Sequence, residues 1–304
     1  IVDYLYTMSI SRQNLSIVIV TFKSDDVIHQ CIKSIDDKIR IIVIENSNNE
    51  KFKEELEREY KNVRCYLTSK NLGMGPGNNL GISKCDTNYI LILNPDVILE
   101  SSTIENMLLA SSKISSFAIL SPLSSNIDYP NYKKFDHEKE TKNSEEPFKV
   151  KSVDGFAMLL NIKELEKLKE KKNTNIFDEN FFMYLENDDL CKRILDKQDN
   201  IYIVPESKIN HLGGRAVNSK YKEEIEYSRN WHWIWSKFYF NKKHNGYLKA
   251  LIQGLPTFFS AIIRTFFYFF INNKIKRNIY FYRASGYLNC LLGKPSWYRP
   301  KIDN

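Results

Sequence analysis

The sequence predicts an α/β fold with a mostly parallel β-sheet and helices on both of its faces. Short apolar, β-branched runs recur at residues 16–21, 40–45, 63–67 and 89–93, which is typical of strands buried on both faces. A polar or helix-patterned segment separates each run from the next, as the crossover connections of parallel strands require. The 304 residues are 42% hydrophobic and 27% charged, which is sufficient for a packed core and argues against general disorder.

The segments between these runs carry the signals of helix starts, turns and loops. Ser24 and two following acids open a predicted helix whose apolar residues, from Val27 to Ile35, have helical spacing. Residues 126–147 are polar and predict an irregular surface excursion. A short strand is expected to end at Pro205, because proline has no N–H to donate to a strand ladder. The short strand before Pro205 is expected at 201–204, and a strand-like segment at 153–162. Helices are predicted at 51–60, 101–112 and 186–197, and a further helix ends near residue 172.

A tripeptide, Asn94-Pro95-Asp96, follows the apolar run at 89–93. Proline stops the ladder, so Asp96 is the first carboxylate presented after the strand. Open α/β sheets bind ligands at the carboxyl ends of their strands, and a hard divalent cation that carries phosphates prefers an oxygen ligand. The tripeptide therefore predicts a ligand site at this edge.

Polar and glycine-rich segments follow two other predicted strands. Glu45 ends the second strand and could accept hydrogen bonds from a nucleotide's base or ribose, although a turn with a solvated acid has the same pattern. Residues 71–81 hold four glycines, whose backbone N–H groups can approach a phosphate closely. A tight loop that needs positive φ is the other interpretation. The spacing fits neither a dinucleotide fingerprint nor a P-loop.

A dense acid–aromatic block covers residues 177–193. Glu186 and Asp189 lie three residues apart at a predicted helix start and so share one face. An aromatic wall can raise the pKa of a carboxylate and suit it to general-base catalysis, whereas acids in a first turn also complement the helix dipole. His211 precedes two glycines that would allow a ligand close approach, although a lone histidine is more often a polar surface or core residue.

Taken in order, these motifs resemble family 2 glycosyltransferases with the nucleotide-sugar-binding fold called GT-A, and within them the rhamnosyltransferase-like branch of bacterial surface polysaccharide synthesis. The resemblance covers roughly residues 16–217. The motifs that carry it are residues 16–22, 43–47, 71–79, 94–96, 153–157 and 177–193, with His211.

The resemblance implies an inverting, metal-dependent hexosyltransferase that uses a nucleoside-diphosphate sugar. Asp96 and His211 would hold Mg²⁺ or Mn²⁺, and Asp154 with Gly155 would lie on the acceptor and sugar side. The residues implied in nucleotide and donor binding are Thr21, Glu45, Asn71, Gly73, Asn78 and Asn94.

The catalytic base is the position where this sequence departs from the family pattern. The family usually shows Glu-Asp-x-Asp, whereas Asn187 occupies the second position here and cannot accept a proton. Glu186 and Asp189 are the remaining candidates that match the pattern, and we expect one of them to deprotonate the acceptor hydroxyl.

The last part of the chain differs from the rest in charge and composition. From residue 231 onward, eight lysines and four arginines face one acid, a net charge of +11, which leaves −4 for residues 1–230. Residues 248–271 are mostly apolar but include Arg264 and Pro256. We expect association with an anionic membrane surface, with a spanning helix and a soluble helical cap or oligomer interface as alternatives. The predicted organisation is a tail at 1–15, a catalytic domain at 16–220 and a basic, aromatic, helical region at 221–304.

The function predicted overall is transfer of a sugar, with dTDP-rhamnose as the expected donor, to a glycan or lipid-linked acceptor. A nucleotide-sugar-binding scaffold that has lost catalysis is the alternative, because Asn94 and Asn187 stand where the family has acids. The basic, aromatic tail alone would also suit a nucleic-acid binder, but its apolar content argues against that role. Five cysteines without paired spacing, and the lack of a secretory signal at residues 1–7, predict a cytoplasmic protein peripheral to the membrane.

Overall fold

The computed structural model describes residues 11–126, 128–135, 145–168, 175–213 and 216–302. The chain divides into two compact units. Unit 1 comprises Ile1–Asn71, Gly77–Phe177 and Asn187–Asn218, and unit 2 comprises Leu72–Pro76, Asp178–Glu186 and Ser219–Asn304. The part of the excursion at 136–144, and the end of the helix expected near 172, lie outside the described residues.

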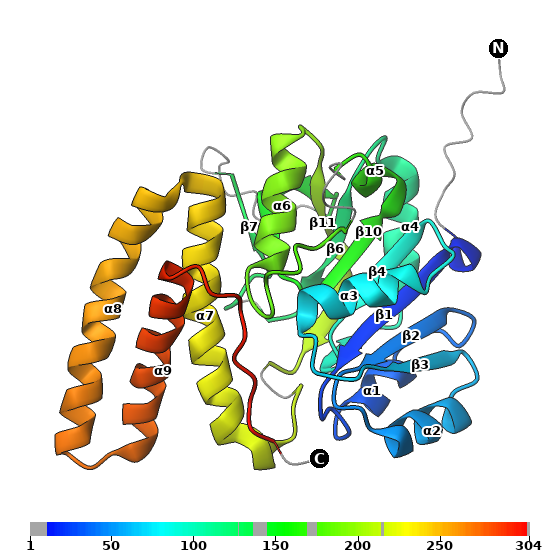
Figure 1. Cartoon of the computed structure of the whole chain (residues 1–304). Helices are drawn as coiled ribbons and strands as arrows, with labels where there is room; N and C mark the ends of the chain where they lie inside the picture. Colours follow the sequence, from blue (N-terminus) through cyan, green and yellow to red (C-terminus); the bar gives the residue numbers. More distant parts are fainter. Residues whose placement is uncertain (1–10, 127, 136–144, 169–174, 214–215, 303–304) are drawn as a thin grey trace. The chain divides into compact units, whose positions relative to one another are not determined.

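Unit 1 is built on one large mixed sheet, and its elements alternate as the sequence predicts (Figure 1). The strands are β1 (Leu15–Thr21), β2 (Arg40–Glu45), β3 (Val63–Leu67), β4 (Tyr89–Leu93), β5 (Val97–Leu99), β6 (Ile119–Ser124), β7 (Tyr132–Lys133), β8 (Phe148–Lys149), β9 (Ser152–Val153), β10 (Ala157–Asn161) and β11 (Ile201–His211). The helices are α1 (Ile28–Lys33), α2 (Glu50–Glu59), α3 (Met74–Ser83), α4 (Thr103–Lys113), α5 (Ile162–Glu166) and α6 (Glu186–Asp196).

The strand order of this sheet is β3-β2-β1-β4-β10-β6-β11-β5, with β8 added against β11, and β7 pairs with β9 separately. The first four strands are parallel, whereas β10 runs antiparallel between β4 and β6. Strand β1 is buried along its whole length, because helices and loops cover both faces of the sheet at its centre. The predicted α/β class, of the GT-A kind, with a helical C-terminal region, is confirmed.

The prediction that the strand at 201–204 ends at Pro205 is wrong. Strand β11 continues to His211 because its pairing with β6 is irregular between Val204 and Lys208. Pro205 lies within that irregularity, where no ladder N–H is required of it. The continuation matters for function, since it carries His211 to the edge where Asp96 lies.

Unit 2 is dominated by three long helices, α7 (Lys222–Asn245), α8 (Tyr247–Phe270) and α9 (Lys274–Leu291) (Figure 1). Aromatic side chains from α7 and α9, including Trp231, Trp235 and Tyr287, form its buried core. Gly286 allows α9 to approach α7 closely, because a Cβ there would overlap the carbonyl oxygen of Trp231. Among the described residues, α8 is the one helix long and apolar enough to cross a membrane, with a mean hydropathy of 1.3.

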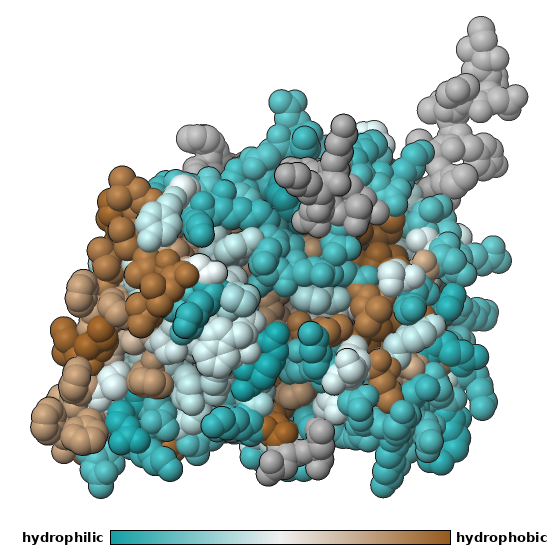
Figure 2. All heavy atoms as spheres, viewed as in Figure 1, coloured by the Kyte–Doolittle hydropathy of each residue, from teal (hydrophilic) through white to brown (hydrophobic). Residues whose placement is uncertain are grey.

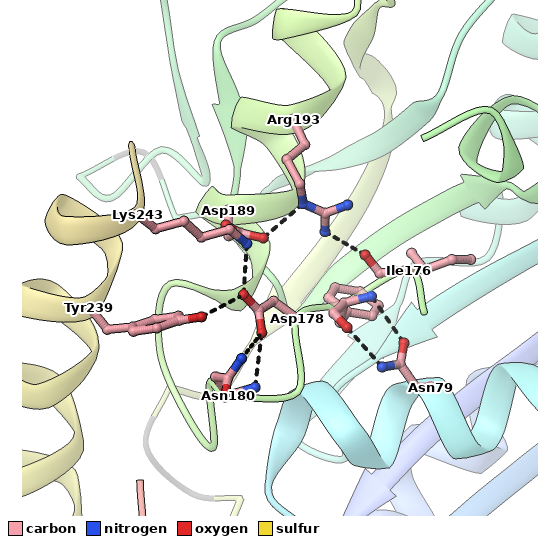
Figure 3. Close-up of polar contacts among 9 residues, drawn as sticks. Asn79, Ile176, Asp178, Asn180, Asp189, Arg193, Tyr239 and Lys243 are labelled. Atoms are coloured by element: carbon pink, nitrogen blue, oxygen red, sulfur yellow. Dashed lines mark hydrogen bonds and ion pairs between the residues drawn. The ribbon is translucent and has the colours of Figure 1, made fainter. Parts of the chain in front are cut away.

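A buried acid joins the loop of unit 2 to α7 (Figure 3). The Asp178 carboxylate accepts hydrogen bonds from Asn180, from the Tyr239 hydroxyl at 3.1 Å and from Lys243 Nζ at 2.7 Å. Burial raises the pKa of Asp178, but the hydrogen bonds from Lys243 and Asn180 outweigh it and hold that pKa below the ordinary value. This part of the acid–aromatic block is therefore structural.

Candidate functional site

The carboxyl ends of the parallel strands bring several predicted residues to one edge of the sheet. Thr21 and Glu45 face each other in the register of β1 and β2, and both side chains are almost fully buried. The Thr21 hydroxyl donates to the carbonyl oxygen of Ile44. Open α/β sheets bind ligands at this edge, and the contact of these two residues with a nucleoside stays a prediction.

The Glu45 carboxylate is already occupied by the turn that follows it. One of its oxygens accepts from the backbone N–H and the hydroxyl of Ser47, and the other accepts from the backbone N–H of Asn49 at 2.8 Å. Asn49 in turn caps the start of α2 by accepting from the N–H of Phe52. The geometry supports the turn interpretation of Glu45, and its contact with a nucleoside stays a prediction.

The glycines at 71–81 serve close packing. A Cβ on Gly73, which has φ of +85°, would overlap the carbonyl oxygen of Phe182 within unit 2. Within unit 1, Gly77 and Gly81 allow α3 to lie against Val20 and Val18 of β1. Because protein atoms fill these positions, the structure favours the tight-loop interpretation over a phosphate cradle.

Two asparagines at this part of the chain differ in what they contact. Asn79 exchanges a pair of hydrogen bonds with the backbone of Phe177, at 2.9 and 3.0 Å, and so fixes α3 within unit 1 (Figure 3). Asn78 Oδ1, by contrast, is buried and accepts no hydrogen bond among the described residues. An orphaned buried acceptor is costly unless a ligand satisfies it, which agrees with the prediction of Asn78 as a donor-binding residue. Asn71 is half-buried and stays a prediction.

Asp96 and His211 come together because β5 and β11 pair at their ends. Val97 lies opposite His211 in that register, and the N–H of Leu212 donates to the carbonyl oxygen of Asp96. His211 Nε2 lies 3.5 Å from Asp96 Oδ1, and the His211 ring stacks on Phe156 at 4.1 Å between centroids. The Asp96 side chain is 1% exposed, and its Oδ1 accepts no hydrogen bond among the described residues.

This pair fits a hard divalent cation. A buried carboxylate oxygen without a donor, beside an imidazole nitrogen, offers two ligands of the kinds that Mg²⁺ and Mn²⁺ accept, with phosphate and water left to complete the shell. No group of three or more His, Cys, Asp or Glu side chains with metal-binding geometry occurs in the described part of the chain. The site could therefore hold a metal only together with a ligand that supplies further oxygens.

Asn94 lies at the same edge of the sheet, directly after β4. Its backbone N–H donates to the carbonyl oxygen of Phe156, and its carbonyl oxygen accepts from the Cys31 thiol at 3.6 Å. Asn94 Oδ1 is buried and accepts no hydrogen bond among the described residues. Burial, and then the charge of Asp96, raise the pKa of Cys31, so this thiol is a neutral neighbour of the site.

Asp154 follows β9 and lies close to the start of α6. Nδ2 of Asn187 donates to the carbonyl oxygen of Val153 at 2.8 Å, and the side chain of Asn187 lies against Gly155. Asp188, the next residue of α6, pairs with Lys133 Nζ at 2.7 Å. The structure thus places the amide that interrupts the acidic motif directly beside the peptide that carries Asp154.

The surroundings of Asp154 favour its protonated form. Desolvation by neighbouring protein atoms and the charge of Asp188 raise the pKa of Asp154, while Lys133 and His211 act in the opposite direction. Its side chain is nevertheless exposed at the surface of unit 1. An accessible carboxylate with a raised pKa is suited to accept a proton from a bound hydroxyl.

The two base candidates named from the motif lie on α6. Asp189 is fully buried, and its Oδ2 accepts from Nε of Arg193 at 2.9 Å, while Arg193 also donates to the carbonyl oxygen of Ile176 (Figure 3). This ion pair fixes the carboxylate in place, which favours a structural role for Asp189. Glu186 begins α6 and is 8% exposed.

Several residues of this site escaped the sequence interpretation. Lys133 and Asp188 tune Asp154, Phe156 supports His211, and Cys31 lies beside Asp96. Only Phe156 and Asp188 lay inside motifs that had been singled out. Lys133 lies in the polar excursion and Cys31 in a helix, where nothing in the pattern marks them.

Comparisons with known proteins bear on the family and the fold of this chain. A family profile described as "Glycosyl transferase family 2" matches residues 16–189. A search of curated proteins finds no match. Solved structures similar in fold include GalNAc-T7, crystallised with UDP, GalNAc and Mn²⁺, at 17% identity and a TM-score of 0.53 over 72% of this chain, which spans 51% of that protein.

A second similar structure is S. aureus TarS, residues 1–349. It is 12% identical with a TM-score of 0.50, and the match covers 94% of this chain and 93% of that one. At these sequence identities the two structures support the fold alone. The family profile covers more than half of the sequence and therefore shows the family. The chain belongs to glycosyl transferase family 2.

Proposed function

We propose that this protein transfers a sugar, with inversion, from a nucleoside-diphosphate sugar to an acceptor hydroxyl. The observation that carries the proposal is the meeting of Asp96 and His211 at the ends of β5 and β11, where a buried carboxylate oxygen accepts no hydrogen bond from the residues that the structure describes. In the step, the acceptor oxygen bonds to the anomeric carbon as the bond to the diphosphate breaks, and a base takes the hydroxyl proton.

Asp96 and His211 would hold the Mg²⁺ or Mn²⁺ that a diphosphate carries. When bound, the metal supplies positive charge to the leaving diphosphate. Asn94, whose amide oxygen also accepts no hydrogen bond in the described part of the chain, would contact the sugar or a ribose. Thr21, Glu45, Asn71, Gly73 and Asn78 remain the proposed nucleotide and donor residues.

We assign the base to Asp154, in place of Glu186 or Asp189. Asp154 is exposed, its pKa is raised, and it adjoins Asn187 at the position where the motif has lost its acid. The ion pair with Arg193 argues against Asp189. Glu186 is the remaining candidate from the motif, and the variants described in the Discussion separate it from Asp154.

The donor and acceptor are proposed from the resemblance alone. We propose dTDP-rhamnose as the donor, and as the acceptor a glycan or lipid-linked molecule in the synthesis of a bacterial surface polysaccharide. The proposed catalytic domain comprises residues 16–220 and acts on the cytoplasmic face of the membrane. UDP sugars belong in the same test, since the GalNAc-T7 structure holds UDP and GalNAc.

The test measures binding and turnover separately. Thermal unfolding is recorded with dTDP, UDP and GDP, each with and without Mn²⁺, because a ligand that binds the folded state raises Tm in proportion to its affinity. Donor consumption is then measured for the matching sugars with and without acceptor glycans. Metal-dependent binding with transfer supports the proposal, whereas metal-dependent binding without transfer or hydrolysis from any donor supports the scaffold alternative.

A further inference from the structure

One face of α8 is an uncovered apolar stripe. At 100° per residue, Leu248, Ile252, Phe259, Ile263, Phe266 and Phe270 fall within an arc of about 60° on the helix. Each of these side chains is more than half exposed, up to 80% for Phe270. In the space-filling view, brown side chains gather along the helix at this edge (Figure 2). We call these six residues the α8 stripe.

The opposite face of α8 is the one that packs in unit 2. Ala250 and Ala261 are buried there, and Gly254 makes room for the ring of Tyr287 from α9. Only 11% of the most apolar part of α8 is buried inside the protein. The helix therefore has two apolar faces, one used within the fold and one left outward, and contiguous exposed apolar surface of this kind marks an interaction site.

Arg264, the one charged residue in the middle of α8, lies away from the α8 stripe. Arg264 Nη1 donates to the Tyr280 hydroxyl at 3.0 Å, and its guanidinium lies 5.1 Å from the centre of that ring. Tyr280 stacks on Tyr268, over which Lys276 is placed at 5.4 Å. These contacts draw two cations toward the seam between α8 and α9, so the stripe itself carries no charge.

The charges that flank the stripe are all of one sign. Residues 231–302 contain no Asp or Glu. Lys249 lies in the first turn of α8, and Lys274, Lys276 and Arg277 follow its most apolar end, Phe266 to Ile271, within the first turn of α9. A second copy of this chain would bring like charges together across the stripe, whereas anionic lipid headgroups are complementary to them.

The geometry points to an anionic lipid bilayer as the occupant, with α8 lying in the plane of the interface; we propose that the α8 stripe is inserted among the acyl chains. The helix is about 36 Å long at 1.5 Å per residue, enough to cross a bilayer. A crossing would, however, carry its neighbour α9 into the hydrocarbon, with Arg277 and Arg283 along its length. An in-plane helix keeps those cations at headgroup depth.

Co-sedimentation with vesicles tests the proposal on the full chain, independently of sugar transfer. The protein should pellet with vesicles of phosphatidylcholine and 30% phosphatidylglycerol, and the triple variant F259S/I263S/F266S should partition at least about a hundredfold less. Leu109→Ser, at an exposed apolar residue of α4 in unit 1, is the matched control and should bind like the wild type. The proposal is wrong if the wild type stays in the supernatant, or if the triple variant pellets with the vesicles to the same extent as the wild type.

A tryptophan reporter keeps the test valid if the triple variant unfolds. The four native tryptophans set a background that the wild type measures. On vesicles, Phe266→Trp should show a larger blue shift of its emission and more quenching by brominated lipid than the wild type, while Leu109→Trp should show neither increase. Washing with alkaline carbonate should release the bound protein, and retention would instead indicate a spanning α8. A wild-type dimer that the triple substitution converts to a monomer, without vesicle binding, would identify a second copy as the occupant and overturn the lipid proposal.

Discussion

Replacing Asp154 with asparagine tests the proposed base most directly. Asparagine keeps the shape of the side chain but cannot accept a proton. Removal of a general base lowers rates by about 100- to 10,000-fold, or about 2.7 to 5.4 kcal/mol of transition-state stabilisation. We expect kcat to fall by this factor while KM for the donor stays within about threefold. The reason is that Asp154 interacts with the proposed metal ligands through the charge of His211 and not by direct contact.

The charged neighbours of Asp154 predict the direction in which the pH profile of the reaction shifts. A purely structural role of Asp154 would predict no such shift. Because its pKa is raised, kcat/KM should fall as pH decreases through that pKa, where the carboxylate becomes protonated. Asp188→Asn removes a charge that raises the pKa, so the acidic limb should move to lower pH. Lys133→Met removes a charge that lowers the pKa, so the limb should move to higher pH.

The opposite directions are the control. Both substitutions break the same ion pair between Lys133 and Asp188, so any effect of losing that pair would move both profiles the same way. Initial rates from pH 5 to 9, measured over a range of acceptor concentrations with saturating donor and Mn²⁺, give the profiles of kcat/KM. An Asp154→Asn variant that keeps more than a third of wild-type kcat, or the same acidic limb, refutes the assignment, and Glu186→Gln then becomes the variant to measure.

Three further outcomes follow from the structure. Asp189→Asn leaves Arg193 unpaired in a buried site and should lower the free energy of unfolding by about 3 to 5 kcal/mol in urea titrations; an unchanged stability with lost turnover would instead support Asp189 as base. Gly286→Ala gains about 1 kcal/mol of helix propensity but forces a Cβ onto the backbone of Trp231, so thermal unfolding should show a net loss of about 1 to 2 kcal/mol. Asp96→Asn should abolish the Mn²⁺-dependent part of the Tm increase given by nucleoside diphosphates, and an increase equal to that of the wild type would contradict the metal assignment.

The fold followed from local pattern wherever strands are buried on both faces. The runs at 16–21, 40–45, 63–67 and 89–93 are β1 to β4 within one residue of their expected bounds, since short, β-branched apolar runs are typical of parallel strands buried on both faces. Beyond β4 the pattern failed to show that β10 runs antiparallel or that β11 passes Pro205. Direction and register of a strand depend on partners far away in the sequence, which periodicity does not encode.

The site shows the same division between local and distant information. Asp96 could be predicted, because it lies directly after a buried strand and a proline. Its meeting with His211 depends on a strand pairing 115 residues apart along the chain, which only the resemblance anticipated. For Glu45 the sequence pattern left two interpretations open, because a position at the end of a strand suits both a ligand contact and a turn. The hydrogen bonds that Glu45 accepts from Ser47 and Asn49 show the turn.

The interrupted motif at residues 186–189 shows why a missing acid need not mean missing chemistry. A base is required wherever a hydroxyl must lose its proton, but a carboxylate from another segment can meet that requirement if folding brings it to the same place. Asn187 uses its amide to hold the carbonyl oxygen of Val153, and so fixes the peptide that precedes Asp154. Asp188, at the position that the motif leaves unspecified, then raises the pKa of Asp154. If Asp154 is the base, as proposed, the amide of Asn187 and the charge of Asp188 act together on one carboxylate, and the departure at Asn187 requires no loss of catalysis.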